Sequence, residues 1–169
     1  MARCIPDRLH AVQFDEAEAE LLERLRFELS DEYIVIPCLE VPRQRGAIDS
    51  EADFVILHPR GRLVLEVKGG EIGCQGGRWY RVRKGHRESI APPFYQARDN
   101  SYEIREYLER LCGRESVEAR MPFNQAMVFT DVDFNAQTFE CPKERIVDRA
   151  ELAAHTLAEI VGRLLDDGE

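Results

Sequence analysis

The sequence predicts an α/β fold in which a mixed β-sheet is flanked by helices. Two observations predict it. Hydrophobic patterns of helical and strand type follow one another in the order helix, several strands, helix, strand, helix. The chain has 169 residues, the length of one compact domain, and no repeat or linker divides it. We therefore expect a single domain over residues 1–169, with its core at about 15–165.

The first expected elements are an amphipathic helix and a strand. Apolar side chains recur at helical spacing over residues 15–29, and Asp15 is placed to cap this helix. A strand follows at residues 33–41, where Pro37 favours a sheet edge or a bulge.

Residues 51–68 carry the strongest pattern, which is that of a β-hairpin. Two β-branched, apolar runs flank the turn sequence PRGR at residues 59–62. A tight turn about Arg60–Gly61 would place Val55 opposite Glu66, and Asp53 opposite Lys68. Because side chains alternate along a strand, one face would carry Asp53, Val55, Leu57, Val64, Glu66 and Lys68. The other face would be wholly apolar, with Phe54, Ile56, Leu63, Leu65 and Val67.

The second half of the chain predicts two helices and two strands. The glycine-rich residues 69–77 favour a turn-rich loop, and a strand follows at residues 78–83. A helix is expected from about residue 94 to residue 111, after Pro92–Pro93 and before Gly113. A buried strand at residues 123–130 and a last helix over about 150–165 complete the pattern.

The charge of the chain is unevenly distributed. The formal net charge of −9 argues against a protein that coats nucleic acid over its whole surface. Acidic residues, however, gather in segments 15–32 and 148–169, whereas segment 58–87 holds eight basic residues against two acidic ones. The sequence therefore allows nucleic acid to bind through one basic groove.

Composition also bears on the cellular compartment. No apolar run approaches the roughly 20 residues of a membrane-spanning helix, so no membrane partner is expected. The five cysteines are odd in number and form no C-x-x-C pair, which favours a reducing cytoplasm and free thiols.

The polar face of the hairpin suggests hydrolytic chemistry. Asp53 and Glu66 would offer two converging carboxylates, a hard oxygen site of the kind that Mg²⁺ prefers. Such a metal activates a water and neutralises charge on a phosphate. Lys68 would orient that water or stabilise the negative charge that develops. Hydrolysis of a phosphodiester needs each of these parts.

The spacing of these residues resembles that of a known superfamily. Asp53, twelve residues and then Glu66-Val67-Lys68 give the D…E-x-K pattern of PD-(D/E)XK nucleases. The longer strings EADFVIL (51–57), HP (58–59), VLEVKGG (64–70) and GRWY (77–80) resemble the nuclease-related domain, or NERD, branch. Pro92–Pro93, Gln96–Ala97 and Asn100 at the next helix are similar too.

The resemblance implies a restriction-endonuclease-like core in the order αβββαβ and a particular site. Asp53 and Glu66 would be metal ligands together with the main-chain carbonyl of Val67, and Lys68 would be the catalytic lysine. Gln96 would close the site from its helix, whereas Asn100 stands where related nucleases often carry tyrosine. A glutamate of the first helix would complete the site, either Glu18, Glu20 or Glu16.

The function implied is a Mg²⁺-dependent nuclease, for which Mn²⁺ can substitute, that hydrolyses DNA in processing, repair or defence. A helicase or another DNA-processing protein is a possible partner, since many NERD domains are joined to such modules. The alternative is a catalytically silent nucleic-acid-binding module on the same scaffold. A hydrolase of another phosphate ester is a third interpretation.

A basic and aromatic segment follows the hairpin. Basic residues interleaved with Trp79 and Tyr80 suit phosphate contacts and base stacking. The candidate nucleic-acid contacts are Arg78, Arg81, Arg83, Lys84 and Arg87. The alternative, a strand with Trp79 buried and the arginines paired to acids, stays open.

Overall fold

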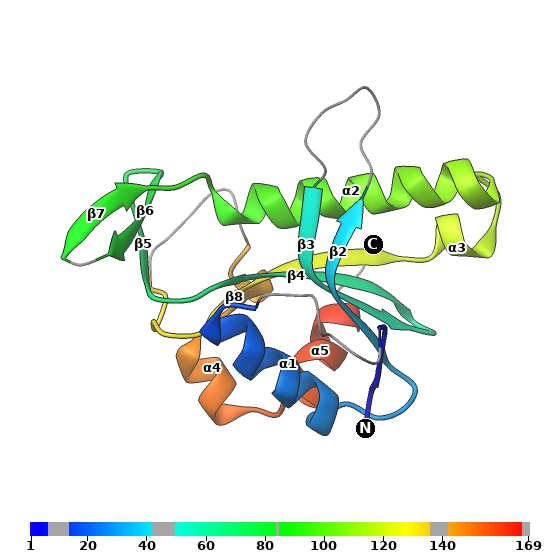
Figure 1. Cartoon of the computed structure of the whole chain (residues 1–169), viewed down its shortest axis with the longest axis horizontal. Coiled ribbons are helices and arrows are strands. Elements are labelled where there is room, and N and C mark those ends of the chain that lie inside the picture. The colour runs from blue at the N-terminus through cyan, green and yellow to red at the C-terminus, as the bar shows by residue number, and fades with distance from the viewer. Residues whose placement is uncertain (7–13, 42–49, 84, 136–141, 167–169) are drawn as a thin grey trace.

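The computed structural model describes residues 1–6, 14–41, 50–83, 85–135 and 142–166. A central sheet lies between two helical layers (Figure 1). Helix α2 (Pro93–Cys112) covers one face of this sheet, whereas α1 (Glu16–Glu28), α4 (Arg149–Ala154) and α5 (Leu157–Asp166) cover the other. Lys84 of the basic segment lies outside the described residues.

In the part of the chain that the structure describes, the central sheet has six strands in the order β1-β2-β3-β4-β8-β9. Their bounds are β1 Arg3–Cys4, β2 Ile34–Val41, β3 Ser50–His58, β4 Gly61–Lys68, β8 Phe123–Phe129 and β9 Ile146–Val147. Strands β2, β3 and β4 are antiparallel, whereas β8 runs parallel to β4. A parallel return requires a long crossover, which α2 supplies. The core order is thus αβββαβ, in agreement with the sequence-based expectation.

The hairpin forms, but the predicted register is wrong by two residues. His58 pairs with Gly61 and Val55 with Val64, so the turn lies at Pro59–Arg60. The predicted pairs of Val55 with Glu66 and Asp53 with Lys68 therefore do not occur. A shift of two residues keeps every side chain on its predicted face.

Packing confirms the two faces of the hairpin. The apolar face packs against α1 and α5, and its members are Phe54, Ile56, Leu63, Leu65 and Val67. On the opposite face Val55 and Val64 pack against Ile104 of α2. Both faces of β4 are buried, so the end of this strand is held from both sides.

Helices α1 and α2 begin and end where their sequences indicate. Asp15 caps α1 in a reciprocal capping box with Glu18, whose Oε2 accepts the Asp15 amide hydrogen at 3.0 Å. Pro93 occupies the first turn of α2, and Gly113 ends the helix with a φ of 92°. A short helix α3 (Val117–Arg120) follows, and its Ser116 side chain accepts the Ala119 amide hydrogen.

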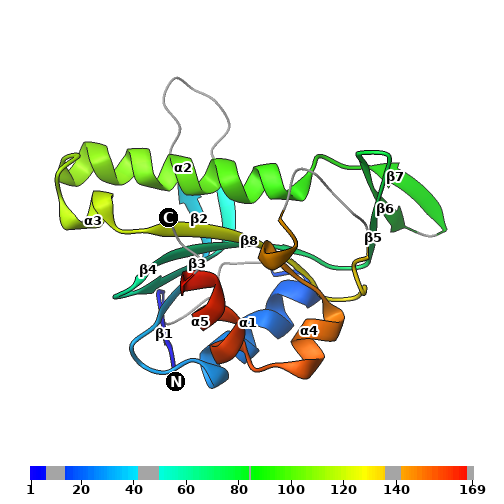
Figure 2. The same ribbon diagram turned by 180° about the vertical axis from the view of Figure 1, so that it is seen from behind.

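Among the described residues, three strands form a second sheet at the end of β4, on the left in Figure 1 and on the right in Figure 2. Its strands are β5 (Glu71–Gln75), β6 (Arg78–Arg83) and β7 (His86–Ser89). The expected glycine-rich loop is therefore wrong over residues 71–75, which pair with β6. Positive φ values at Gly76 (58°) and Gly77 (75°) confine the turn to those two residues.

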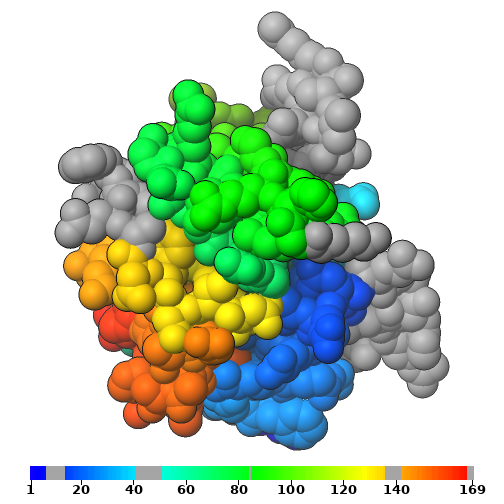
Figure 3. All heavy atoms as spheres, turned by 90° about the vertical axis from the view of Figure 1, so that its left-hand side faces the viewer, coloured from blue at the N-terminus to red at the C-terminus, as the bar shows by residue number. Residues whose placement is uncertain are grey.

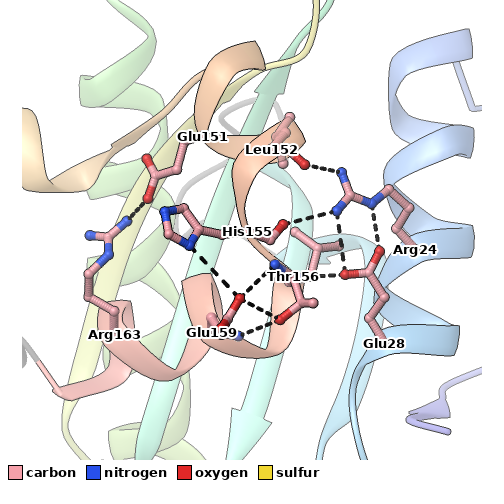
Figure 4. A network of polar contacts seen from close by, with 9 residues as sticks. Arg24, Glu28, Glu151, Leu152, His155, Thr156, Glu159 and Arg163 are labelled. Atoms are coloured by element: carbon pink, nitrogen blue, oxygen red, sulfur yellow. Dashed lines mark hydrogen bonds and ion pairs between the residues drawn. The ribbon is translucent and has the colours of Figure 1, made fainter.

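The expected last helix is broken into two. Residues 143–145 form a 3-10 helix, η1 (Lys143–Arg145), before β9, and the chain then turns at His155 between α4 and α5. Thr156 and Glu159 exchange hydrogen bonds that start a new helix, a T-x-x-E capping box (Figure 4). Glu28 of α1 accepts the Leu157 amide hydrogen at 2.6 Å and fastens this junction to α1.

Two further sequence-based expectations concern the whole chain. Among the described residues, no helix combines the length and the apolar character that crossing a membrane would require. Cys38 and Cys112 are free thiols, as expected, and Cys141 lies outside the described residues.

Candidate active site

The end of the β3–β4 hairpin brings Asp53, Glu66 and Lys68 together. The Lys68 Nζ donates to Glu66 Oε1 at 2.6 Å, and this ion pair is largely shielded from water. Asp53 Oδ2 accepts the Val67 amide hydrogen at 2.7 Å. The Asp53 carboxylate thus lies against the main chain between Glu66 and Lys68, beyond the last regular pair of the ladder, Phe54 with Leu65.

Both carboxyl groups are buried, and burial controls their protonation. Asp53 is 9% exposed and Glu66 is 3% exposed. Burial and the nearby Glu66 carboxylate raise the pKa of Asp53 to about 7, although Lys68 and the Val67 amide oppose the change. Burial also raises the pKa of Glu66, against the attraction of Lys68. Two buried acids beside one ammonium leave a local excess of negative charge.

The site has features that fit a divalent cation. Glu66 Oε2 is fully buried and has no hydrogen-bond partner, an arrangement that costs free energy unless a cation or water satisfies it. Asp53 and Glu66 provide hard oxygen donors, the chemistry that Mg²⁺ requires. Within the described residues, no group of three or more His, Cys, Asp or Glu side chains is arranged to hold a metal. A cation here would therefore use two carboxylates, main-chain oxygen such as the Val67 carbonyl, and water.

The three glutamates considered for α1 occupy different places. Glu18 lies near enough to Asp53, Glu66 and Lys68 to interact electrostatically with each of them. Burial raises the pKa of Glu18, and its hydrogen bond from the Asp15 amide opposes that change. Glu16 and Glu20 instead line a neighbouring cavity between α1 and the second sheet.

Helix α2 contributes Gln96 and Asn100 in two different ways. Asn100 is 4% exposed, and its Nδ2 donates to the Glu51 carbonyl at 2.9 Å, which ties α2 to the start of β3. Gln96 is exposed and lines a cavity of about 370 Å³ that Glu51 and Asn100 also line. Asn100 is therefore a structural link, and Gln96 is free to face a ligand in that cavity.

These two positions predict opposite outcomes on substitution. Asn100→Ala should lower the free energy of unfolding by about 1–2 kcal/mol, because a buried hydrogen bond is lost. Gln96→Ala should change it by less than about 0.5 kcal/mol, because its side chain is exposed. Denaturant unfolding of both variants checks this. An Asn100→Ala protein as stable as the wild type, or a clear loss of stability in Gln96→Ala, would contradict it.

Glu51 and Cys38 belong to the same cluster and were missed from the sequence. The Cys38 thiol hydrogen-bonds with Glu51, and burial together with the Glu51, Glu18 and Asp53 carboxylates raises its pKa to about 12. The thiol is thus neutral. Cys38 has a φ of 48°, uncommon for a non-glycine residue, in the gap between the pairs Pro37–Phe54 and Leu39–Ala52. Glu51 could have been found, since it precedes Asp53 by two residues.

The candidate nucleic-acid contacts separate into different environments. Trp79 is 2% exposed and stacks on Phe129 and Phe134 with ring centroids 6.1 and 5.3 Å away, so it is closed to base stacking. Arg87 donates to Gln75 Oε1 and lies 4.3 Å over the Tyr80 ring. Arg78 is exposed. Arg81 and Arg83 line the cavity beside α1.

The fold is restriction-endonuclease-like, because its central mixed sheet follows the order αβββαβ. An acidic pair and a lysine lie at the end of its hairpin. A family model agrees with this class: the nuclease-related domain (NERD) model matches residues 15–130. The chain belongs to the NERD family, as its sequence motifs suggested. No curated protein and no solved structure matches the chain significantly.

Proposed function

We propose that this protein is a metal-dependent nuclease that hydrolyses DNA phosphodiester bonds. The observation that carries the proposal is the buried cluster at the end of the hairpin, where Glu66 Oε2 lacks a partner and Lys68 stands beside it. Membership of the NERD family supports a nuclease-related role. The proposal concerns the reaction, the metal and the substrate together.

Each residue of the cluster would have a distinct role in the proposed hydrolysis. Asp53, Glu66 and the Val67 carbonyl would hold Mg²⁺ or Mn²⁺, which when bound supplies a Lewis acid for water and phosphate. Glu18 would add negative charge from α1. The Lys68 ammonium would leave its pairing with Glu66 in part to orient the attacking water and to stabilise charge on the phosphate. Gln96 would position substrate from the side of α2.

Burial of the two acids explains why a metal would be needed. A buried carboxylate pair is costly to ionise, as the raised pKa of Asp53 indicates. A divalent cation offsets that cost and keeps both carboxylates ionised at neutral pH. The same burial excludes water that would screen the charges during the reaction.

Cleavage of single-stranded, linear and supercoiled DNA tests the proposal. We expect product with Mg²⁺ or Mn²⁺ and none with a chelator. A silent nucleic-acid-binding module would bind DNA without cutting it, and calorimetric titration would detect no metal binding that depends on Asp53. Absence of cleavage with both metals on all three substrates would contradict the proposal.

A further inference from the structure

The second sheet is attached directly to the candidate site. It leaves the central sheet after Lys68 through Gly69 and Gly70 and returns to α2 just before Gln96. Space is restricted where it leaves, because a Cβ at position 69 would lie 2.8 Å from the Ala17 Cβ of α1. This close packing, together with the Gly70 amide hydrogen bond to Asp131 Oδ2 at 2.7 Å, positions the start of the second sheet beside Lys68.

The buried Trp79 shows which face of β6 looks toward the body of the protein. Trp79 stacks on Phe129, at the end of β8, and on Phe134. Side chains alternate along a strand, so Arg81 and Arg83 lie on the face of Trp79, and Arg78 lies on the other. Alternation thus separates basic residues that are neighbours in sequence.

Arg81 and Arg83 form the basic part of a cavity of about 580 Å³. The cavity is also lined by Gly69 and Gly70, by Thr130 and by four acidic residues, Asp15, Glu16, Glu20 and Asp131. Figure 3 shows the face where the second sheet (green), α1 (blue) and the residues after β8 (yellow) meet. An anion entering this cavity is attracted by the two β6 arginines and repelled by the acids at α1 and by Asp131, whose Oδ2 accepts the Gly70 amide hydrogen at 2.7 Å.

Arg81 has donor capacity that its protein contacts do not use. Its Nε is buried without a hydrogen-bond partner. Its ion pair with Glu88, directly across on β7, spans 4.0 Å, and both side chains are substantially exposed. Such a pair contributes little. The buried Nε is closed to an entering ligand, but the side chain is 41% exposed and lines the cavity, so its terminal guanidinium nitrogens can donate to an oxygen ligand there.

We propose that Arg81 binds a backbone phosphate of a nucleic-acid strand in this cavity, next to the bond that is cleaved. The inference rests on the proposed function for its ligand and adds the direction in which the strand leaves the site. The strand passes along the β6 side of the cavity, where Arg83 assists. Arg78 and Arg87 do not contribute, because one faces away and the other is occupied by Gln75 and Tyr80.

DNA binding in the presence of a chelator tests this inference without requiring catalysis. The probes are one oligonucleotide as a single strand and as a duplex, and the proteins are the wild type, Arg81→Ala, Arg81→Lys and Arg78→Ala. For the better-bound probe, Arg81→Ala should weaken binding about tenfold. It should also reduce the slope of log K against log salt by about one. Arg81→Lys should recover part of the loss, and Arg78→Ala should stay within about twofold of the wild type.

The outcomes separate the two proposals. Equal losses in Arg81→Ala and Arg78→Ala, no loss in Arg81→Ala, or no binding by the wild type would overturn the Arg81 inference. Binding that depends on Arg81 but gives no product with any divalent metal would sustain it and contradict the nuclease proposal. Thermal unfolding of each variant shows that a loss of binding does not come from unfolding.

Discussion

Replacing Lys68 with alanine should reduce DNA cleavage by about 10²–10³-fold, the cost of removing one preorganised charge from a reacting centre. The Lys68 Nζ lies 2.6 Å from Glu66 Oε1 at the end of β4, so its position is set by the strand and by the ion pair. The affinity for DNA measured with a chelator should change far less, because the inferred phosphate contacts lie on β6. Single-turnover rates and binding constants measured together separate the two effects.

The Lys68 variant needs controls because the residue also stabilises a buried acid. Without the ammonium, Glu66 is left 3% exposed with both carboxylate oxygens unpaired, so its pKa should rise further. Lys68→Gln keeps a hydrogen-bond donor for Glu66 without the charge, and it should be inactive even when it is folded. Lys143→Ala removes an exposed lysine from η1 and should keep full activity. Wild-type rates in both Lys68 variants would remove Lys68 from the mechanism.

The second large expected effect is a fall in the stability of the metal-free protein as pH rises, and its source is Asp53. The pKa of Asp53 is raised from an ordinary value of 3.8 to about 7 in the metal-free fold. At a pH between these two pKa values, Asp53 keeps its proton in the native state but has released it in the unfolded chain. The contribution of Asp53 to the free energy of unfolding is therefore complete below about pH 4, declines as pH rises, and is lost above about pH 7.

Asp53→Asn should remove the part of this dependence that Asp53 contributes, since asparagine does not titrate and can still accept the Val67 amide hydrogen, and it should leave the smaller part that Glu66 contributes. At pH 8 without metal, the variant should be more stable than the wild type by about 2–4 kcal/mol. It should nevertheless lose cleavage activity and the stabilisation that Mg²⁺ gives the wild type. Thermal unfolding from pH 4 to pH 8, with and without Mg²⁺, measures the two effects on stability, and a cleavage assay measures the loss of activity.

Asp31→Asn provides the matched control, because Asp31 is an exposed acid outside the candidate site. It should follow the wild type in pH dependence, metal stabilisation and activity. The assignment of Asp53 would be wrong if Asp53→Asn kept its response to Mg²⁺, or if its metal-free stability declined with pH as the wild type's does.

The central hairpin shows what sequence could predict. The alternation of apolar and polar residues is a local property, so the two faces of β3 and β4 were predicted correctly. The register depends on where the turn closes, and Pro59–Arg60 closes it one residue earlier than Arg60–Gly61 would. Because the error was two residues, Asp53, Glu66 and Lys68 still share one face.

The remaining differences depend on contacts between distant segments. Strand β5 forms from glycine-rich residues because β6 pairs with it, which no local propensity indicates. The break at His155 has a local T-x-x-E signal, but the Glu28 contact that fixes it comes from α1. Cys38 joins the acidic cluster through a distortion of β2 at a position where the sequence shows only a cysteine after a proline. Chemistry-bearing residues were predictable where they lay on regular strands.

The stacking of Trp79 on Phe129 and Phe134 also gives the protein an intrinsic fluorescent probe. The chain contains one tryptophan, so its tryptophan fluorescence arises from a single place, the contact between the second sheet and the end of β8. The unlabelled protein therefore carries a built-in probe on the strand that bears Arg81. A change in emission when DNA is added would mean that this contact responds to the ligand, and an unchanged spectrum would mean that the two sheets behave as one rigid body.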